Sequence, residues 1–301
     1  KSWQFCQNFK IKKINKRKKE CNIENLLNPK IDYVFKRIFG YQGNEEITTA
    51  FLSSILNKQI SNLELNCNPI LEKDLLDDKV GILDIKARID NNINCNIEMQ
   101  VIDKKNIEKR ILFYWSKMYN KSISVGEDCE KLEKSIAILI TDYELEGLKK
   151  IEKYITKWNI REEEYQKIIL TDVMEIYIIE LPKFEKYKKK ANNKLNSWVK
   201  FIENPEVVDM SENKEVCKAK RVLEEISQDE HERYLAELRQ KYIMDQKAIE
   251  GAGYDKGLKA GIQQEKISIA KNMKNQNIDI KIISKVTGLS IEEIKDLKDL
   301  D

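Results

Sequence analysis

The chain has 301 residues, of which 35% are charged and 8% aromatic, and its formal net charge is +3. This length suits one catalytic-sized domain with an appendage. Without a long apolar run or a signal-peptide pattern, we expect a soluble cytoplasmic protein that has no membrane partner. One histidine, and six cysteines without CxxC spacing, exclude histidine-based nucleases, Ser-His-Asp triads and HExxH metalloproteases, and argue against zinc sites and structural disulfides.

The N-terminal segment carries most of the positive charge. Residues 1–20 contain eight Lys or Arg and one Glu, so this segment has a net charge of +7. Because the whole chain has a net charge of +3, the remaining residues sum to −4. We expect residues 1–27 to be a basic, solvated and disordered tail, and a nucleic-acid-binding arm is the alternative. Any nucleic-acid contact made by the body of the protein must therefore use a local basic patch.

Two helices and a strand are expected next. The segment KIDYVFKRIFG, residues 30–40, has the spacing of a short amphipathic helix that ends at Gly40. Residues 45–56 place apolar side chains along one stripe and predict a second helix. A strand is expected near residues 63–70.

Residues 81–102 alternate between apolar and polar side chains, which is typical of two half-buried strands. The apolar faces match only if the connecting loop has an odd number of residues, and Asp90-Asn91-Asn92 supplies such a loop. In this register Asp84 lies opposite Glu98. Opposed Cβ atoms are roughly 4.5–5.5 Å apart, so two carboxylates there need a cation or a shared proton.

The rest of the chain predicts further alternation of elements. We expect a helix over residues 105–121, a buried strand over 135–141, and strands within 154–161 and 175–181. Together with the earlier elements they predict an α/β core over residues 28–190, with a mixed central sheet flanked by helices. A charged helical extension over 191–267 and a small helical C-terminal module over 268–301 should follow.

The C-terminal module resembles a helix-turn-helix by pattern, with a Gly-containing turn at residues 287–290. Its second helix, however, carries several acidic side chains that would repel phosphate. We therefore favour a packing or partner-binding module over a base-reading one.

The hairpin also suggests chemistry. Asp84 and Glu98, with the backbone carbonyl of Met99 and substrate phosphate oxygens, could form the octahedral oxygen shell that Mg²⁺ prefers, and Mn²⁺ is a plausible substitute. Gln100 and Lys86 project from the same face. A metal there would support phosphodiester hydrolysis without histidine. The alternative is a solvated polar face, in which nearby basic side chains or water neutralise the two acids.

The helix after the hairpin has a basic face. Arg110, Tyr114, Lys117 and Lys121 follow one another at i, i+4, i+7 and i+11, which gives one side of the helix a phosphate-binding character. A solvated basic face is the alternative. Because the helix follows the hairpin directly, we favour contact with DNA.

These motifs carry a family resemblance. The order D(84)IKAR and IE(98)MQ(100), preceded by KIDYVFKRIFG and followed by RILFYWSKMY, resembles the PD-(D/E)XK nuclease superfamily. Within it, the chain looks like the recombination-promoting nuclease and putative transposase family of prokaryotes. The resemblance covers about residues 28–185 and extends to the pattern of the C-terminal helices. It implies a restriction-endonuclease-like core.

The resemblance implies a metal-dependent DNA endonuclease, linked to DNA recombination or mobility, in which Asp84 and Glu98 bind the metal. Where the superfamily motif ends in lysine, this chain has Gln100, which can orient water but cannot supply charge, so catalysis could be slow. Lys86 is a candidate source of the missing charge. Asp32, on the first helix, is a tentative metal or water contact, and an i, i+4 pair with Lys36 or a helix cap is the alternative.

Two other functions stay open. The chain could be a catalytically weak or inactive DNA-binding or assembly protein that retains the nuclease fold. It could also be a partner-binding adaptor dominated by its C-terminal helices, through which several copies could associate. The first would bind DNA without cutting it, and the second would not bind DNA at low salt.

Overall fold

The computed structural model describes residues 26–66, 70, 75–76, 84–103, 105–190, 193–208 and 213–297. Residues 1–25 of the expected basic tail, residues 67–69 of the strand predicted near 63–70 and the start of the hairpin at 81–83 lie outside the described residues. At the end of the expected tail, Leu27 is buried in the core and its backbone N–H donates to Ser227 Oγ at 2.9 Å, so the prediction of a solvated tail is wrong at this residue. The chain divides into two compact units, Lys1–Ile243 and Met244–Asp301. None of the described helices has both the length and the apolar character needed to cross a membrane.

The strands in the described part of the chain form one six-stranded mixed sheet in the order β1-β2-β3-β4-β6-β5. β3 runs parallel to β4 and β4 parallel to β6, whereas the remaining neighbours are antiparallel. The strands are β1 (Leu63–Asn66), β2 (Ile85–Ile89), β3 (Ile93–Gln100), β4 (Lys134–Thr141), β5 (Ile155–Trp158) and β6 (Met174–Glu180). β4 lies in the middle of the sheet, as its almost wholly apolar sequence predicts.

The hairpin of β2 and β3 has the predicted register. Ile89 pairs with Ile93 and Ile85 with Ile97, around a turn in which Asp90 and Asn91 adopt positive φ angles of 50° and 66°. Asp and Asn tolerate this left-handed conformation better than most residues because their short polar side chains bond locally. The three-residue loop therefore sets which side chains share each face.

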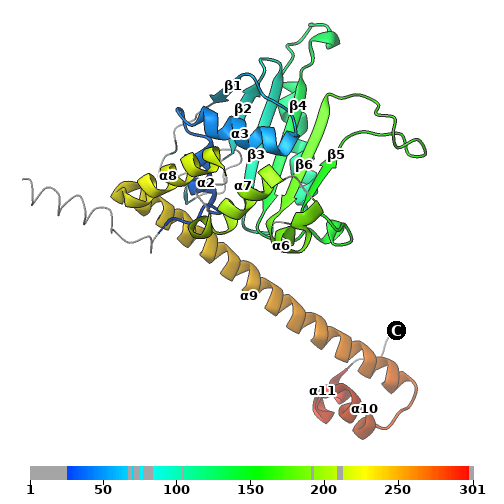
Figure 1. Cartoon of the computed structure of the whole chain (residues 1–301). Coiled ribbons are helices and arrows are strands. Elements are labelled where there is room, and N and C mark those ends of the chain that lie inside the picture. The colour runs from blue at the N-terminus through cyan, green and yellow to red at the C-terminus, as the bar shows by residue number, and fades with distance from the viewer. Residues whose placement is uncertain are drawn as a thin grey trace, which may run out of the picture. The chain divides into compact units, whose positions relative to one another are not determined.

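Helices cover both faces of the sheet. On one face, visible in Figure 1, lie α2 (Asp32–Phe39), α3 (Glu45–Leu56), α7 (Asn193–Glu203) and α8 (Lys214–Gln228). Their aromatic side chains interlock over the inward-facing residues of β2, β3 and β4; the central rings belong to Phe35, Phe39, Phe51, Trp198 and Phe201. This face forms the larger core.

The opposite face carries a smaller core under α5 (Ile107–Asn120). Ile107 and Ile111 of α5 pack on Leu139 of β4 and Ile178 of β6. The indole nitrogen of Trp115 also donates to the carbonyl of Ser135 at 2.8 Å. These contacts place α5 over β4 and β6, and leave its other side toward the polar face of the β2–β3 hairpin.

The helices after the sheet do not all form a separate extension. α6 (Phe184–Tyr187), α7, α8 and the first turns of α9 (Glu230–Asn275) contribute buried side chains to the same large core. The compact unit consequently ends at Ile243, whereas the sequence suggested a core ending near residue 190. The apolar stripe of α8, which ends at Ile226, explains this packing.

The second unit, Met244–Asp301, contains the rest of α9 and the short helices α10 (Ile280–Thr287) and α11 (Ile291–Asp296). Gly288 ends α10 with φ +71°, and Ser290 begins α11 with a reciprocal capping box to Glu293. Ala270, Ile283 and Ile294 form its small core. The two helices expected around the Gly-containing turn are therefore present.

Candidate active site

The two acids singled out by the hairpin register lie side by side. Ile85 pairs with Ile97, so continuing the antiparallel register by one residue brings Asp84 opposite Glu98. Glu98 is buried, with 7% of its surface exposed, and Asp84 is partly buried. Ionising both of two neighbouring carboxylates in a poorly solvated position costs free energy, because they repel each other and lack hydration.

The electrostatics of the pair reflect this conflict. Burial and, to a smaller extent, repulsion from Asp84 together raise the pKa of Glu98 to about 7, against the opposing effects of Gln100 and Arg110. Burial also raises the pKa of Asp84, against the opposing effects of Lys86 and of a hydrogen bond from Asn96. Perturbed acids of this kind cluster at functional sites.

Among the described residues, Glu98 has two polar partners. The side-chain amide of Gln100 donates to Glu98 Oε1 at 2.6 Å, and Arg110 of α5 approaches the same oxygen at 3.6 Å. The Gln100 amide therefore lies directly against the Glu98 carboxylate. Met99, between the two, buries its side chain in the opposite core.

A cleft of about 950 Å³ opens beside the pair. Asp84 and Lys86 line it from the hairpin, and Tyr114, Lys117 and Lys121 line it from α5 and the residue that follows. The structure therefore brings three of the four side chains expected to contact DNA into the same cleft as one of the two acids. The fourth, Arg110, lies at Glu98 instead.

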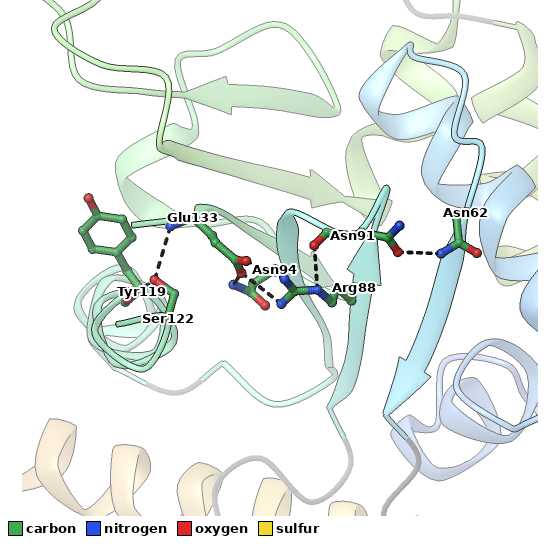
Figure 2. A network of polar contacts seen from close by, with 7 residues as sticks. All are labelled: Asn62, Arg88, Asn91, Asn94, Tyr119, Ser122 and Glu133. Atoms are coloured by element: carbon green, nitrogen blue, oxygen red, sulfur yellow. Dashed lines mark hydrogen bonds and ion pairs between the residues drawn. The ribbon is translucent and has the colours of Figure 1, made fainter. Parts of the chain in front are cut away.

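A polar network fastens the far end of this cleft (Figure 2). Glu133, just before β4, binds both terminal guanidinium nitrogens of Arg88 and accepts a hydrogen bond from Asn94 at 2.9 Å. The Nε of Arg88 donates to the carbonyl of Asn91 in the hairpin turn at 2.9 Å. Arg88 is therefore engaged in holding the hairpin against the start of β4.

The acidic residue of the first helix has a different partner from the one predicted. Asp32 accepts hydrogen bonds from Arg239 of α9 at 2.6–3.1 Å, and both side chains are nearly inaccessible to solvent. Arg239 also donates to the carbonyl of Leu75 at 3.1 Å. The Asp32 carboxylate is consequently occupied by an ion pair that ties α2 to α9.

The acid pair has a chemistry that fits a divalent cation. Within the described residues, no three Asp, Glu, His or Cys side chains gather closely enough to hold a metal by themselves. Oxygen ligands from water and substrate would thus complete the shell, as is usual for Mg²⁺. The buried Oδ1 of Asn96, beside Asp84, has no hydrogen-bond partner among the described residues. A metal-bound water would supply that missing donor.

A model of the PD-(D/E)XK nuclease family transposase matches residues 29–252, about three quarters of the chain. The chain belongs to this family. The match confirms the predicted superfamily and, with the mixed sheet flanked by helices, the predicted restriction-endonuclease-like fold. It also supports a nuclease or transposase-like function. Neither the curated proteins nor the solved structures that were searched gave a significant match.

Sequence reasoning assigned no role to several residues around the candidate site. Asn94 and Asn96 alternate with the apolar residues of β3, so period two alone could have placed them on the face of Glu98. Glu133 and Arg239, in contrast, reach their partners across 45 and 207 residues. No local pattern could have identified those two.

Proposed function

We propose that this protein is a Mg²⁺-dependent endodeoxyribonuclease that hydrolyses phosphodiester bonds and accepts Mn²⁺ in place of Mg²⁺. The observation that carries the proposal is the opposed pair of Asp84 and Glu98 beside a cleft whose α5 wall presents lysines. The family match supports a nuclease, and a nuclease of this family implies DNA as substrate.

The side chains of the site have distinct roles in this proposal. Asp84 and Glu98 would hold the cation together with the Met99 carbonyl, and Gln100 would orient the attacking water. Bound there, the metal would polarise the scissile phosphate and lower the pKa of water. The water oxygen attacks phosphorus as one ester P–O bond breaks, and Lys86 lies on the same face to offset developing charge.

The α5 side of the cleft would bind the DNA backbone. Tyr114, Lys117 and Lys121 line the cleft with Lys86, and long cationic side chains recognise phosphates irrespective of sequence. Arg110 would keep Glu98 ionised and oriented. Asp32 is a weaker candidate for a metal contact, because Arg239 already occupies its carboxylate.

Plasmid cleavage tests this function. Supercoiled DNA incubated with the protein should be cut in Mg²⁺ or Mn²⁺ and left intact in EDTA. Asp84→Asn and Glu98→Gln should abolish cleavage, whereas Glu127→Gln, an exposed loop carboxylate, should not. Equal cutting by all variants would assign the activity to another site or to a contaminant.

One observation favours a second candidate, a DNA-binding or assembly protein that has kept the nuclease fold without efficient chemistry. Glu98 already has protein partners in Gln100 and Arg110, and the motif lysine is replaced. Such a protein would bind DNA equally well in EDTA. It would not cut DNA, whichever divalent ion is added. Its measurable activity would then be DNA binding that weakens as the salt concentration rises.

We also propose a role in DNA recombination or mobility, which rests on the transposase description of the family. A cellular recombination reporter would test it. The wild-type chain should raise the recombination frequency, and Asp84→Asn should not. An equal rise with both would separate this role from strand cleavage.

A further inference from the structure

We propose that Lys36, a buried lysine on α2, is a positioning cation of this site and supplies the positive charge that Gln100 cannot. This inference rests on the proposed nuclease function. It places the charge on a different element from the hairpin, and on a different residue from Lys86.

The path of the Lys36 side chain brings it to the beginning of β2. Lys36 is only 5% exposed. A Cβ atom added at Gly40 would meet Lys36 Cγ at 3.2 Å and Ile85 Cγ1 at 2.8 Å. The stem of Lys36 therefore crosses over Gly40 beside Ile85, the residue that directly follows Asp84. A side chain at position 40 would fill this passage, which explains the glycine there.

The charge of Lys36 reaches the acid pair. Among the described residues, Lys86, Lys36 and Arg110 are cations that favour the charged form of Asp84. Lys86 is exposed, so water screens its charge, whereas Lys36 is enclosed by protein, where a charge acts more strongly. Arg110 lies against Glu98. Lys36 is thus a buried cation whose charge acts on Asp84.

The helix that carries Lys36 is held in place independently. One turn earlier, Asp32 is bound by Arg239, and its Oδ1 also accepts the backbone N–H of Tyr33 at 2.9 Å. Phe35 and Phe39 on the same helix are fully buried in the aromatic core. A fixed charge in such a setting needs no reorganisation when negative charge develops on a phosphate.

Two opposite effects follow from a fixed cation beside a metal-binding pair. The cation stabilises the extra negative charge of the transition state, so its loss should lower the rate. It also repels the divalent ion, so its loss should tighten metal binding. If Lys36 merely supported the fold, its loss should weaken metal binding, because a loosened site binds metal less tightly.

The test compares Lys36→Met, Lys36→Arg and Lys36→Met/Gln100→Lys with the full-length wild type. Lys220→Met is the matched control, since it removes another largely buried lysine, on α8, whose ammonium donates to the Glu206 carbonyl at 3.5 Å. Mn²⁺ affinity is measured by electron paramagnetic resonance without DNA. The kcat and KM for plasmid cleavage are measured separately, and thermal melts verify folding.

In Lys36→Met we expect Mn²⁺ to bind about tenfold more tightly and kcat to fall about 100-fold with KM unchanged. Lys36→Arg should keep the wild-type Mn²⁺ affinity, and Gln100→Lys in the Lys36→Met background should restore at least about tenfold in kcat. Lys220→Met should change neither quantity. Lys36→Gln repeats the test if Lys36→Met does not fold.

Weaker or unchanged Mn²⁺ binding in Lys36→Met would overturn the proposal, as would an unchanged kcat. The proposed function fails differently: a wild-type protein that binds Mn²⁺ at the pair and never cuts DNA is no nuclease. The direction of the affinity change in Lys36→Met would still decide whether Lys36 acts on the pair.

Discussion

At the scale of single residues, the site is built from a conflict between two carboxylates. The strand register brings Asp84 and Glu98 together, and burial keeps water from screening them. Without a cation, the pair can relieve the repulsion by holding a proton near neutral pH. A divalent ion would displace that proton, so metal binding and proton release should be coupled.

The raised pKa of Glu98 predicts how stability depends on pH. Between its ordinary value of 4.5 and about 7, folded Glu98 binds more protons than unfolded Glu98, so the free energy of unfolding should fall as pH rises through this window. The full effect is on the order of 3 kcal/mol. Urea unfolding in EDTA should show the decline, and Glu98→Gln should remove most of it.

A wild-type protein whose stability rises between pH 5 and 7 in EDTA would contradict the raised pKa. Mn²⁺ provides a further check. Since it would bind the folded state preferentially, saturating Mn²⁺ should restore stability at pH 8 in the wild type and not in Glu98→Gln.

At the scale of elements, α5 joins the acid pair to the surface that we propose binds DNA. Its apolar side packs on β4 and β6, and its basic side lines the cleft. The Arg88–Glu133 network holds the hairpin from the other end. The acids and the lysines thus belong to elements that are each anchored to β4.

The lysines of this cleft should control DNA affinity and its salt dependence. Lys117→Gln and Lys121→Gln should each weaken binding to all sequences alike and reduce the slope of log K against log salt by about 1. Lys109→Gln is the matched control, because Lys109 is an exposed lysine of the same helix that does not line the cleft. Fluorescence anisotropy over a salt series measures the slopes, and equal slopes for all variants would remove α5 from the interface.

Much of this arrangement could be predicted from local patterns. Period-two alternation and the three-residue loop were enough to place Asp84 opposite Glu98, and the apolar stripe gave the buried side of α5. The partner of Asp32 could not be predicted, because Arg239 lies 207 residues away and looks like one more charge on a charged helix. The burial of Lys36 could not be predicted either, because it depends on the packing of Gly40 against Ile85 of β2, which lies far away in the sequence.

At the scale of the whole molecule, one buried ion pair connects the beginning of the core to its end. Asp32 of α2 and Arg239 of α9 have side chains that are 12% and 6% exposed. Their connection explains why the compact unit extends to Ile243. The helices that follow the sheet are therefore part of the scaffold that supports α2 and Lys36.

Removing one member of this pair should be costly. Arg239→Met leaves the Asp32 carboxylate buried without its cation, and we expect a loss of about 3–5 kcal/mol in the free energy of unfolding. The double variant Asp32→Asn/Arg239→Met should lose less than Arg239→Met alone, because no uncompensated charge remains. Urea unfolding measures both, and a wild-type stability for Arg239→Met would show that the pair is not needed.

If Asp84 and Glu98 cut DNA through a shared metal ion, as we propose, single-turnover cleavage should depend on both carboxylates. The protein is held in excess over plasmid in Mn²⁺, so that every variant is compared at equal DNA occupancy. We expect Asp84→Asn and Glu98→Gln to bind DNA like the wild type and to cut it at least about 1,000-fold more slowly, a loss of roughly 4 kcal/mol in transition-state stabilisation. Cleavage at the wild-type rate by either variant would contradict this proposal.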